Sequence, residues 1–301
     1  MDHAGQIVML RKAVEIAGLE AAEITLPTDR QMIVGTMRFH YLDWGGSGHP
    51  LLFLHGGGIN AHTWDVVALM LRRRYHCIAL DQRGHGDSEW SPGIDYVVET
   101  QVRDIEGFVE QLGLEHPVLI GQSMGGLNSI AYAIRHSAQM KGLVVVDVGP
   151  EINPAGTNRI REFASTPELD SPEAFLERAV KFNPIRDPAV LRRSLYYNLR
   201  ELPNGKWALK HDQRRAAEEV AARATAQRER LSGEIGRIEC PTLILRGALS
   251  EVISDTGAEK FARSLPKARW VRIEQAGHNI QGDNPRGLLD ALNPFLRELG
   301  I

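Results

Sequence analysis

The pentapeptide Gly121-Gln122-Ser123-Met124-Gly125 is the segment of this chain whose pattern most clearly predicts chemistry. A serine hydroxyl becomes an effective nucleophile only when the chain exposes it, orients it and supplies a base. The apolar run 118–120 precedes the pentapeptide and apolar residues at helical spacing follow it, so the G-x-S-x-G pattern lies between a strand and a helix. Glycines two residues before and after the serine avoid side-chain collisions in such a tight turn. We therefore predict that Ser123 is a nucleophile for acyl transfer.

A base for this serine is predicted near the C-terminus, where Gln275-Ala276-Gly277-His278 follows the last apolar strand. A loop at the carboxyl end of a parallel strand opens at the same sheet edge as the nucleophile turn, so His278 can take the serine proton. The imidazole also needs a carboxylate on its second nitrogen. Two strand ends offer one, and we favour Glu251, which has Ser250 and Ser254 near it as hydrogen-bond partners, over Asp147.

Donors for the oxyanion of a tetrahedral intermediate are predicted in the glycine turn His55-Gly56-Gly57-Gly58, directly after the apolar run 51–54. Glycines let a backbone amide approach the reacting oxygen, and the amide of Met124 at the start of the next helix supplies a second donor. A phosphate-binding turn is the alternative, but the lysine and Ser/Thr of a phosphate loop are missing.

The elements that position these residues are short apolar runs alternating with amphipathic stretches, which predicts βα units and a mainly parallel sheet. The expected parallel strands are residues 51–54, 77–80, 118–120, 143–146, 242–245 and 270–273. Residues 22–26 and 32–42 alternate more strongly, so we expect an antiparallel hairpin at the sheet edge. Residues 1–20 are interpreted as a short helix or arm.

Between residues 149 and 235 strand-like runs give way to helix starts such as Ser171-Pro172 and Asp187-Pro188. Residues 206–231 are expected to form one or two long polar helices. This block follows the strand that ends near Val148, above the edge where the nucleophile emerges. We therefore expect a core of residues 1–148 and 236–301 and a helical lid of residues 149–235, inserted after the sixth strand.

The composition excludes several classes of protein. A formal net charge of −3 over 301 residues gives no electrostatic case for a nucleic-acid partner. No apolar run approaches the roughly 18 to 20 residues of a membrane-spanning helix, and the N-terminus carries no pattern of a secretory signal. No clustered His and Asp ligand set is visible, so neither a metal nor a cofactor is predicted. We expect a cytoplasmic enzyme with no membrane partner, whose two cysteines, Cys77 and Cys240, are core thiols.

Taken in order, these motifs resemble the α/β-hydrolase fold superfamily in its lidded form. The resemblance also includes Asp81-Gln82-Arg83-Gly84-His85-Gly86-Asp87-Ser88, which is similar to a structural loop of that family. It implies Ser123 as nucleophile, His278 as base and the amides of Gly57 and Met124 as the oxyanion hole. Relatives that open epoxides or remove halides carry an aspartate at the nucleophile position, so Ser123 argues against both activities.

The predicted function is hydrolysis of a carboxylic ester or lactone through an acyl-enzyme. Two alternatives remain open from the sequence. The same residues serve in hydrolases that cleave a carbon–carbon bond in products of aromatic ring cleavage, and such enzymes hold a substrate carboxylate with polar groups, often arginine. The third reading is a ligand receptor that keeps the hydrolase pocket and signals through lid movement.

Overall fold

An eight-stranded sheet forms the centre of the protein in a computed structural model. The structure describes residues 1–216, 226 and 229–301. The order of the sheet is β1-β2-β4-β3-β5-β6-β9-β10; β1, β2 and β4 pair antiparallel, and every pair from β4 to β10 is parallel. The strands are β1 (Thr28–Val34), β2 (Met37–Asp43), β3 (Pro50–Leu54), β4 (His76–Leu80), β5 (Val118–Gln122), β6 (Gly142–Val146), β9 (Thr242–Gly247) and β10 (Ala268–Ile273). All six predicted parallel strands are confirmed.

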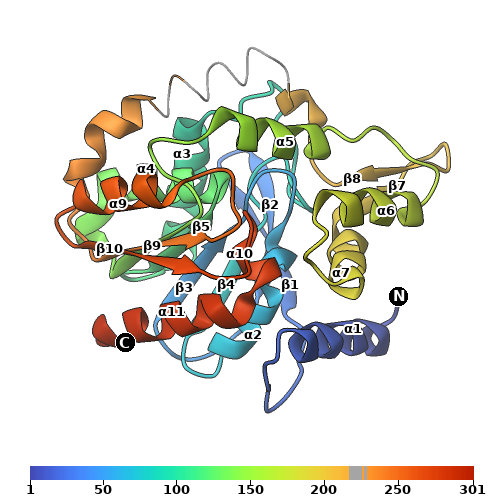
Figure 1. Cartoon of the computed structure of the whole chain (residues 1–301), viewed down its shortest axis with the longest axis horizontal. Helices are drawn as coiled ribbons and strands as arrows, with labels where there is room; N and C mark the ends of the chain where they lie inside the picture. Colours follow the sequence, from blue (N-terminus) through green and yellow to red (C-terminus); the bar gives the residue numbers. More distant parts are fainter. Residues whose placement is uncertain (217–225, 227–228) are drawn as a thin grey trace.

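Helices cover both faces of this sheet (Figure 1) because its central strands are apolar on both sides. In β3, Leu52 and Leu54 point into one core cluster, whereas Leu51 and Phe53 point into the other. The first cluster is closed by α3 (Val98–Gln111), α4 (Met124–His136) and α9 (Asp255–Arg263), and the second by α1 (His3–Ile16), α2 (Asp65–Leu71) and α11 (Pro285–Glu298). The predicted doubly wound α/β arrangement is therefore confirmed.

The edge hairpin exists, but its position differs from the predicted one. It is formed by β1 and β2 alone, which turn at Gly35 and Thr36, and residues 22–26 precede it without forming a strand. Gly35 has a φ of +59°, a conformation that glycine adopts without strain, and this permits the reversal inside the segment that was predicted as one strand.

Between β6 and β9 the chain leaves the sheet and forms α5 (Pro154–Ala164), α6 (Pro172–Phe182), α7 (Pro188–Asn198), β7 (Leu199–Glu201) and β8 (Trp207–Leu209). Both predicted helix starts are confirmed: the side chain of Ser171 accepts from Ala174 N, and that of Asp187 from Ala189 N. A separate small core joins α6, α7 and the β7–β8 pair. Of the predicted polar helix 206–231, residues 207–209 form a strand and 229–231 are helical, whereas 217–225, 227 and 228 lie outside the described residues.

The remaining general features concern the helices and the two thiols. No helix of the described residues combines the length and the apolar character that crossing a membrane requires. Cys77 and Cys240 are buried and unbridged, and burial raises the pKa of Cys240 to about 11. Their prediction as core thiols is confirmed.

Candidate active site

Ser123 occupies a strained turn between the end of β5 and the start of α4. Its backbone φ is +51°, in a region that non-glycine residues rarely adopt. A Cβ on Gly121 would lie 2.3 Å from Gly125 O, and one on Gly125 would lie 2.4 Å from Leu54 O. Both glycines of the pattern are thus required for the close approach of α4 to the strands, and the predicted tight turn is confirmed.

His278 lies in the loop between β10 and the short helix α10 (Ile280–Asp283), and its Nδ1 is 2.7 Å from Oδ2 of Asp147. Asp147 directly follows β6 and is fully buried. Its Oδ1 accepts from Gly247 N at 2.9 Å, and its Oδ2 also accepts from the Ser250 hydroxyl. Three donors therefore fix this carboxylate, which in turn fixes the orientation of the imidazole.

The prediction that Glu251 holds His278 is wrong. The side chain of Glu251 is 60% exposed and pairs with Arg159 on α5, at 3.3 Å between Oε2 and Nη1. The loop after β9 directs Ser250, rather than Glu251, toward Asp147. The less favoured sequence candidate, Asp147, is the residue that the structure places against the imidazole.

The glycine turn after β3 lies against the nucleophile turn. A Cβ on Gly56 would be 3.2 Å from the Cβ of Ser123, and the carbonyl of His55 accepts from Gly125 N at 3.1 Å. The imidazole of His55 donates from Nδ1 to Gly56 O and accepts at Nε2 from Gln82 N, so it fixes the turn. Gly57, next along, is exposed and lines the same cavity as Ser123. These positions are compatible with the predicted oxyanion donors Gly57 and Met124.

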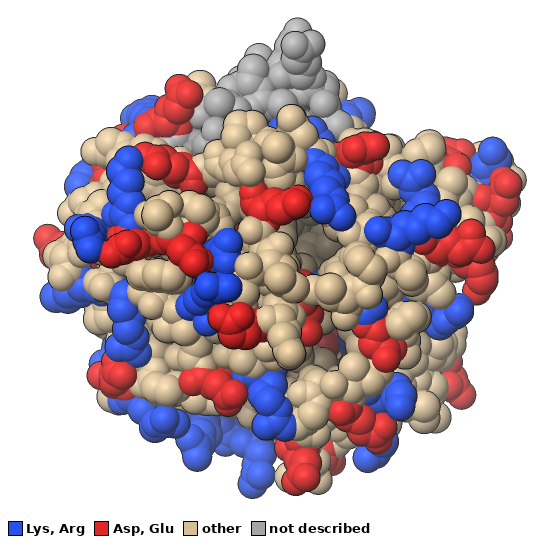
Figure 2. Space-filling view, in the orientation of Figure 1, with Lys and Arg blue, Asp and Glu red and all other residues tan. Residues whose placement is uncertain are grey.

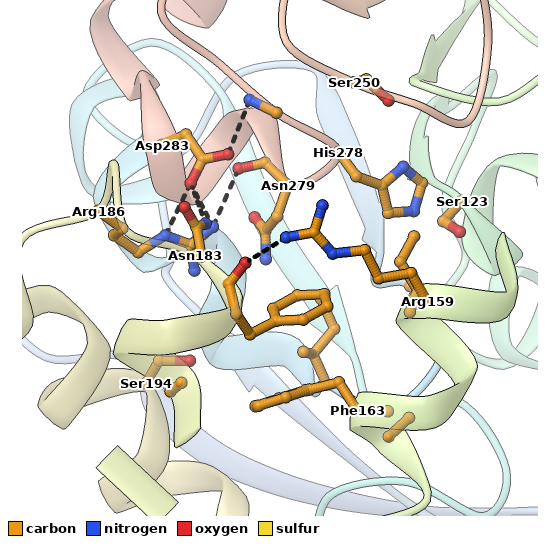
Figure 3. A pocket seen from close by; sticks show the side chains of 18 of the residues that line it. Ser123, Arg159, Phe163, Asn183, Arg186, Ser194, Ser250, His278, Asn279 and Asp283 are labelled. Atoms are coloured by element: carbon orange, nitrogen blue, oxygen red, sulfur yellow. Dashed lines mark hydrogen bonds and ion pairs between the residues drawn. The ribbon is translucent and has the colours of Figure 1, made fainter. Parts of the chain in front are cut away.

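Ser123 and His278 face a cavity of about 310 Å³, here called the Ser123 cavity. Its walls come from the glycine turn, the loops after β9 and β10, and the inserted helices α5 and α7. Figure 3 shows Ser123 and His278 on one side of this cavity and Phe163 of α5 on the other. In Figure 2 the same face is hollowed between the positions of α5, α7 and α10, with charged side chains of both signs around the hollow.

Sequence reasoning missed two arginines that line the Ser123 cavity, Arg159 and Arg186. The sequence shows 15 Lys and Arg against 13 Asp and Glu in residues 149–235, a mixture typical of a solvated surface. Nothing in this pattern distinguishes these two arginines, because their place depends on how α5 and the connection between α6 and α7 pack in the assembled fold. Two aromatic residues of the insertion, Phe163 and Phe182, also line the cavity, whereas a third, Phe175, is buried in the small core of the insertion.

One group of potential metal ligands occurs among the described residues, formed by His40, Asp81 and Asp87. The imidazole of His40 binds two carboxylates, Asp81 through Nδ1 at 2.8 Å and Asp29 through Nε2 at 3.0 Å. Burial by itself would lower the pKa of His40, but these two carboxylates outweigh it and raise the pKa to about 10. An imidazolium has no lone pair for a metal, so we interpret His40 as a structural cation that joins the two carboxylates rather than as a metal ligand.

The His40 cluster predicts a pH-dependent contribution to stability. Because the pKa of His40 rises from 6.5 to about 10 on folding, protonated His40 stabilises the fold fully below about pH 6.5, and this contribution is lost as the pH rises through about 10. His40→Gln is expected to lower the free energy of unfolding by about 2–4 kcal/mol at pH 6.5 and by much less at pH 10. Urea unfolding at both pH values measures the difference, and a gap that stays constant or widens contradicts the prediction.

Comparisons with known proteins agree with this geometry. The chain is 29% identical over 299 residues to esterase Rv0045c of Mycobacterium tuberculosis, covering 97% of this chain and 95% of the relative. A crystal structure of that esterase superposes with a TM-score of 0.77 at 30% identity, covering 99% of this chain and 98% of the other. An sn-1-specific diacylglycerol lipase, ABHD11 of Mus musculus, is 28% identical, covering 86% of this chain and 85% of the lipase.

A further solved structure, of E-2-(acetamidomethylene)succinate hydrolase, superposes with a TM-score of 0.80 at 24% identity, covering 90% of this chain and 99% of the other, and supports the fold alone. The esterase and the lipase are hydrolases by name, which supports a hydrolytic activity for this chain. The family model described as alpha/beta hydrolase fold matches residues 49–285. With the sheet, the nucleophile turn and this match together, the chain belongs to the α/β-hydrolase fold family.

Proposed function

We propose that this protein is a serine hydrolase that cleaves a carboxylic ester or lactone through an acyl-enzyme. The observation that carries the proposal is the hydrogen bond that Nδ1 of His278 donates to buried Asp147. The same histidine faces the cavity that Ser123 lines. The likeness to an esterase over nearly the whole chain supports the same reaction class.

In the proposed first half-reaction, Asp147 accepts a hydrogen bond from Nδ1–H of His278, which leaves Nε2 free to take the hydroxyl proton of Ser123. The serine oxygen bonds to the carbonyl carbon, and the carbonyl electron pair moves onto its oxygen. The amides of Gly57 and Met124 donate to this oxyanion, and the start of α4 adds a favourable dipole. His278 then gives its proton to the alkoxide as the carbon–oxygen bond breaks.

In the second half-reaction, water attacks the acyl-enzyme while His278 takes its proton. The serine oxygen leaves with that proton, which regenerates the hydroxyl of Ser123 and releases the carboxylic acid. Asp147 stabilises the imidazolium in both halves without becoming protonated. No step requires a metal or a cofactor.

We assign residues 149–235 the role of a lid over this chemistry. Helices α5 and α7 contribute walls to the Ser123 cavity, although they lie far from Ser123 in the chain. Arg193 of α7 forms a buried ion pair with Asp65 of α2, which joins the insertion to the core beside the cavity. A lid of this kind limits the access of water and shapes the substrate site.

Labelling by an active-site phosphonate tests the assignment directly. A p-nitrophenyl alkylphosphonate is expected to inactivate the protein with one adduct, on the tryptic peptide 104–135. That peptide holds Ser123 and Ser129, and fragment ions distinguish them. His278→Gln is expected to slow labelling strongly, because the base is lost. An adduct on any residue other than Ser123 contradicts the proposal.

A substrate panel separates the ester reaction from the carbon–carbon alternative. p-Nitrophenyl acetate and butyrate and a lactone report ester hydrolysis, whereas bleaching of a coloured vinylogous diketone reports carbon–carbon cleavage. We expect turnover of the esters. Turnover of the diketone alone would favour the alternative, and labelling of Ser123 without turnover of either class would favour a receptor.

A further inference from the structure

Two arginines line the Ser123 cavity, and their charges are balanced in different ways. Arg186 is nearly buried and donates from Nε and Nη2 to Oδ1 of Asp283, at 2.8 and 2.6 Å. The fully buried carboxylate of Asp283 also accepts from Asn183 and from Gly277 N. Because the protein satisfies this pair from several sides, we interpret Arg186 as a structural cation that joins the insertion to α10.

Arg159 of α5 is held differently. Its Nη2 donates to Phe182 O at 3.2 Å, and its guanidinium carbon lies 5.4 Å from the centre of the Phe182 ring. Phe182 stacks on Phe163, with ring centres 4.5 Å apart. Figure 3 shows the side chain of Arg159 extending from α5 on the side of the cavity where His278 and Ser123 lie. Phe182, itself stacked on Phe163, thus holds the guanidinium of Arg159 at the wall of the cavity.

Within the described part of the chain, the one carboxylate at ion-pair distance from Arg159 is that of Glu251. Both side chains are more than half exposed, 54% for Arg159 and 60% for Glu251, and the Nη1–Oε2 distance is 3.3 Å. Water screens such a pair, so it is weak. A guanidinium binds a carboxylate best through two parallel hydrogen bonds, which a ligand entering the cavity can offer in place of Glu251.

We propose that Arg159 binds a carboxylate of the substrate, so that the preferred esters of this enzyme carry a negative charge besides the ester group. This inference rests on the proposed function, since it assigns a substrate class to the same site. Arg159 is then a specificity-determining residue, and Glu251 is the counter-ion that the substrate displaces.

The size of the cavity limits the length of the substrate ester. About 310 Å³ is at the small end of ligand sites, so a short ester fits better than a long-chain lipid. Ile160, Phe163 and Leu195 give the wall apolar surface between the polar groups. Half-esters of dicarboxylic acids with four to six carbons combine a reactive carbonyl, a few methylenes and a terminal carboxylate, and therefore match this site.

The test compares charged and neutral esters of equal length. Substrates are the p-nitrophenyl half-esters of succinate, glutarate and adipate against p-nitrophenyl butyrate, valerate and hexanoate, with 4-carboxyphenyl butyrate against phenyl butyrate for charge on the alcohol side. We expect wild type to have a higher kcat/KM for a charged ester than for its neutral match on at least one side. Arg159→Gln is expected to lower kcat/KM for that charged ester by about 10- to 100-fold and for the neutral match by less than about threefold.

Matched variants isolate the guanidinium. Arg161→Gln removes an exposed arginine of the same helix that does not line the cavity. It is expected to leave kcat/KM unchanged for both the charged ester and its neutral match. Arg159→Lys keeps the charge without the planar fork and is expected to fall between wild type and Arg159→Gln. Glu251→Gln is expected to raise the preference for charged esters a few-fold, because it removes the competing carboxylate.

A binding arm separates this inference from the proposed function. Monomethyl glutarate is titrated calorimetrically into Ser123→Ala protein, with and without Arg159→Gln, so that turnover plays no part. About tenfold weaker binding in the double variant supports the inference, and equal affinity overturns it. Ser123-dependent hydrolysis of neutral esters with no effect of Arg159 on any charged ester also overturns it, while the proposed function stands. Loss of the proposed function would instead appear as ester hydrolysis that is absent or independent of Ser123.

Discussion

Ser123→Ala is expected to lower kcat/KM for p-nitrophenyl butyrate by about 10⁴- to 10⁶-fold, with the fold unchanged. The size of the effect follows from the loss of the covalent route, after which only the oxyanion donors and the binding of substrate contribute. The substitution removes one oxygen from a half-buried side chain and adds no atom to the strained turn. Steady-state kinetics measure the loss, and thermal unfolding by circular dichroism checks the fold.

A serine of the same cavity provides the control for that result. Ser194 of α7 also lines the Ser123 cavity, and Figure 3 shows it on the side formed by the insertion. Ser194→Ala is expected to retain at least about a third of the activity, because its hydroxyl has no role in the proposed acyl transfer. Full activity in Ser123→Ala, or an equal loss in both variants, would remove Ser123 from the mechanism.

The parts of the site that sequence reasoning predicted correctly are those decided by local geometry. The turn around Ser123 requires glycine at positions 121 and 125, since a Cβ at either would collide with backbone. The G-x-S-x-G pattern shows both glycines, so this requirement is visible in the sequence. The parallel strands were equally readable, because a strand covered by helices on both faces must be apolar throughout. The hairpin was misplaced because one glycine at position 35 decides where an alternating segment reverses.

The acid was misassigned because its position depends on neighbours that are distant in the chain. Asp147 lies at the end of β6, which pairs with β9, and so the Gly247 amide and the Ser250 hydroxyl come to its carboxylate from a segment about 100 residues away. Both candidates follow a strand, and a linear pattern does not record which way a loop side chain points. The sequence signal that could have identified Asp147 is its place directly after the apolar run 142–146, where a carboxylate is expected to be buried and to need partners.

The same limit applies to Arg159. Its place in the cavity depends on how α5 crosses the sheet edge, and neither the charge balance nor the helical spacing of the insertion encodes that crossing. Helix boundaries in the insertion were readable from their caps at Ser171 and Asp187, because capping is local. What the helices cover was readable only from the assembled fold.

Because Asp147, and not Glu251, is the carboxylate that contacts His278, Asp147→Asn is expected to have a large effect on activity. We expect kcat for p-nitrophenyl butyrate to fall by about 10⁴-fold, since an amide that donates to Nδ1 would hold His278 in the tautomer whose Nε2 already carries a proton. The amide has the same shape as the carboxylate and keeps an acceptor for Gly247 N, so the protein is expected to fold. Kinetics at saturating substrate measure the loss, and circular dichroism confirms the fold.

Glu251→Gln provides the opposite expectation on the same neutral ester. Its carboxylate is exposed and contacts Arg159 rather than His278, so kcat is expected to stay within about threefold of wild type. A large loss in Glu251→Gln with little effect of Asp147→Asn would mean that the loop after β9 rearranges in the working enzyme. It would restore Glu251 as the acid and would leave Arg159 without its counter-ion in the catalytic state. The pair of variants therefore tests the acid assignment and the carboxylate site together, because both depend on where this one loop directs Ser250 and Glu251.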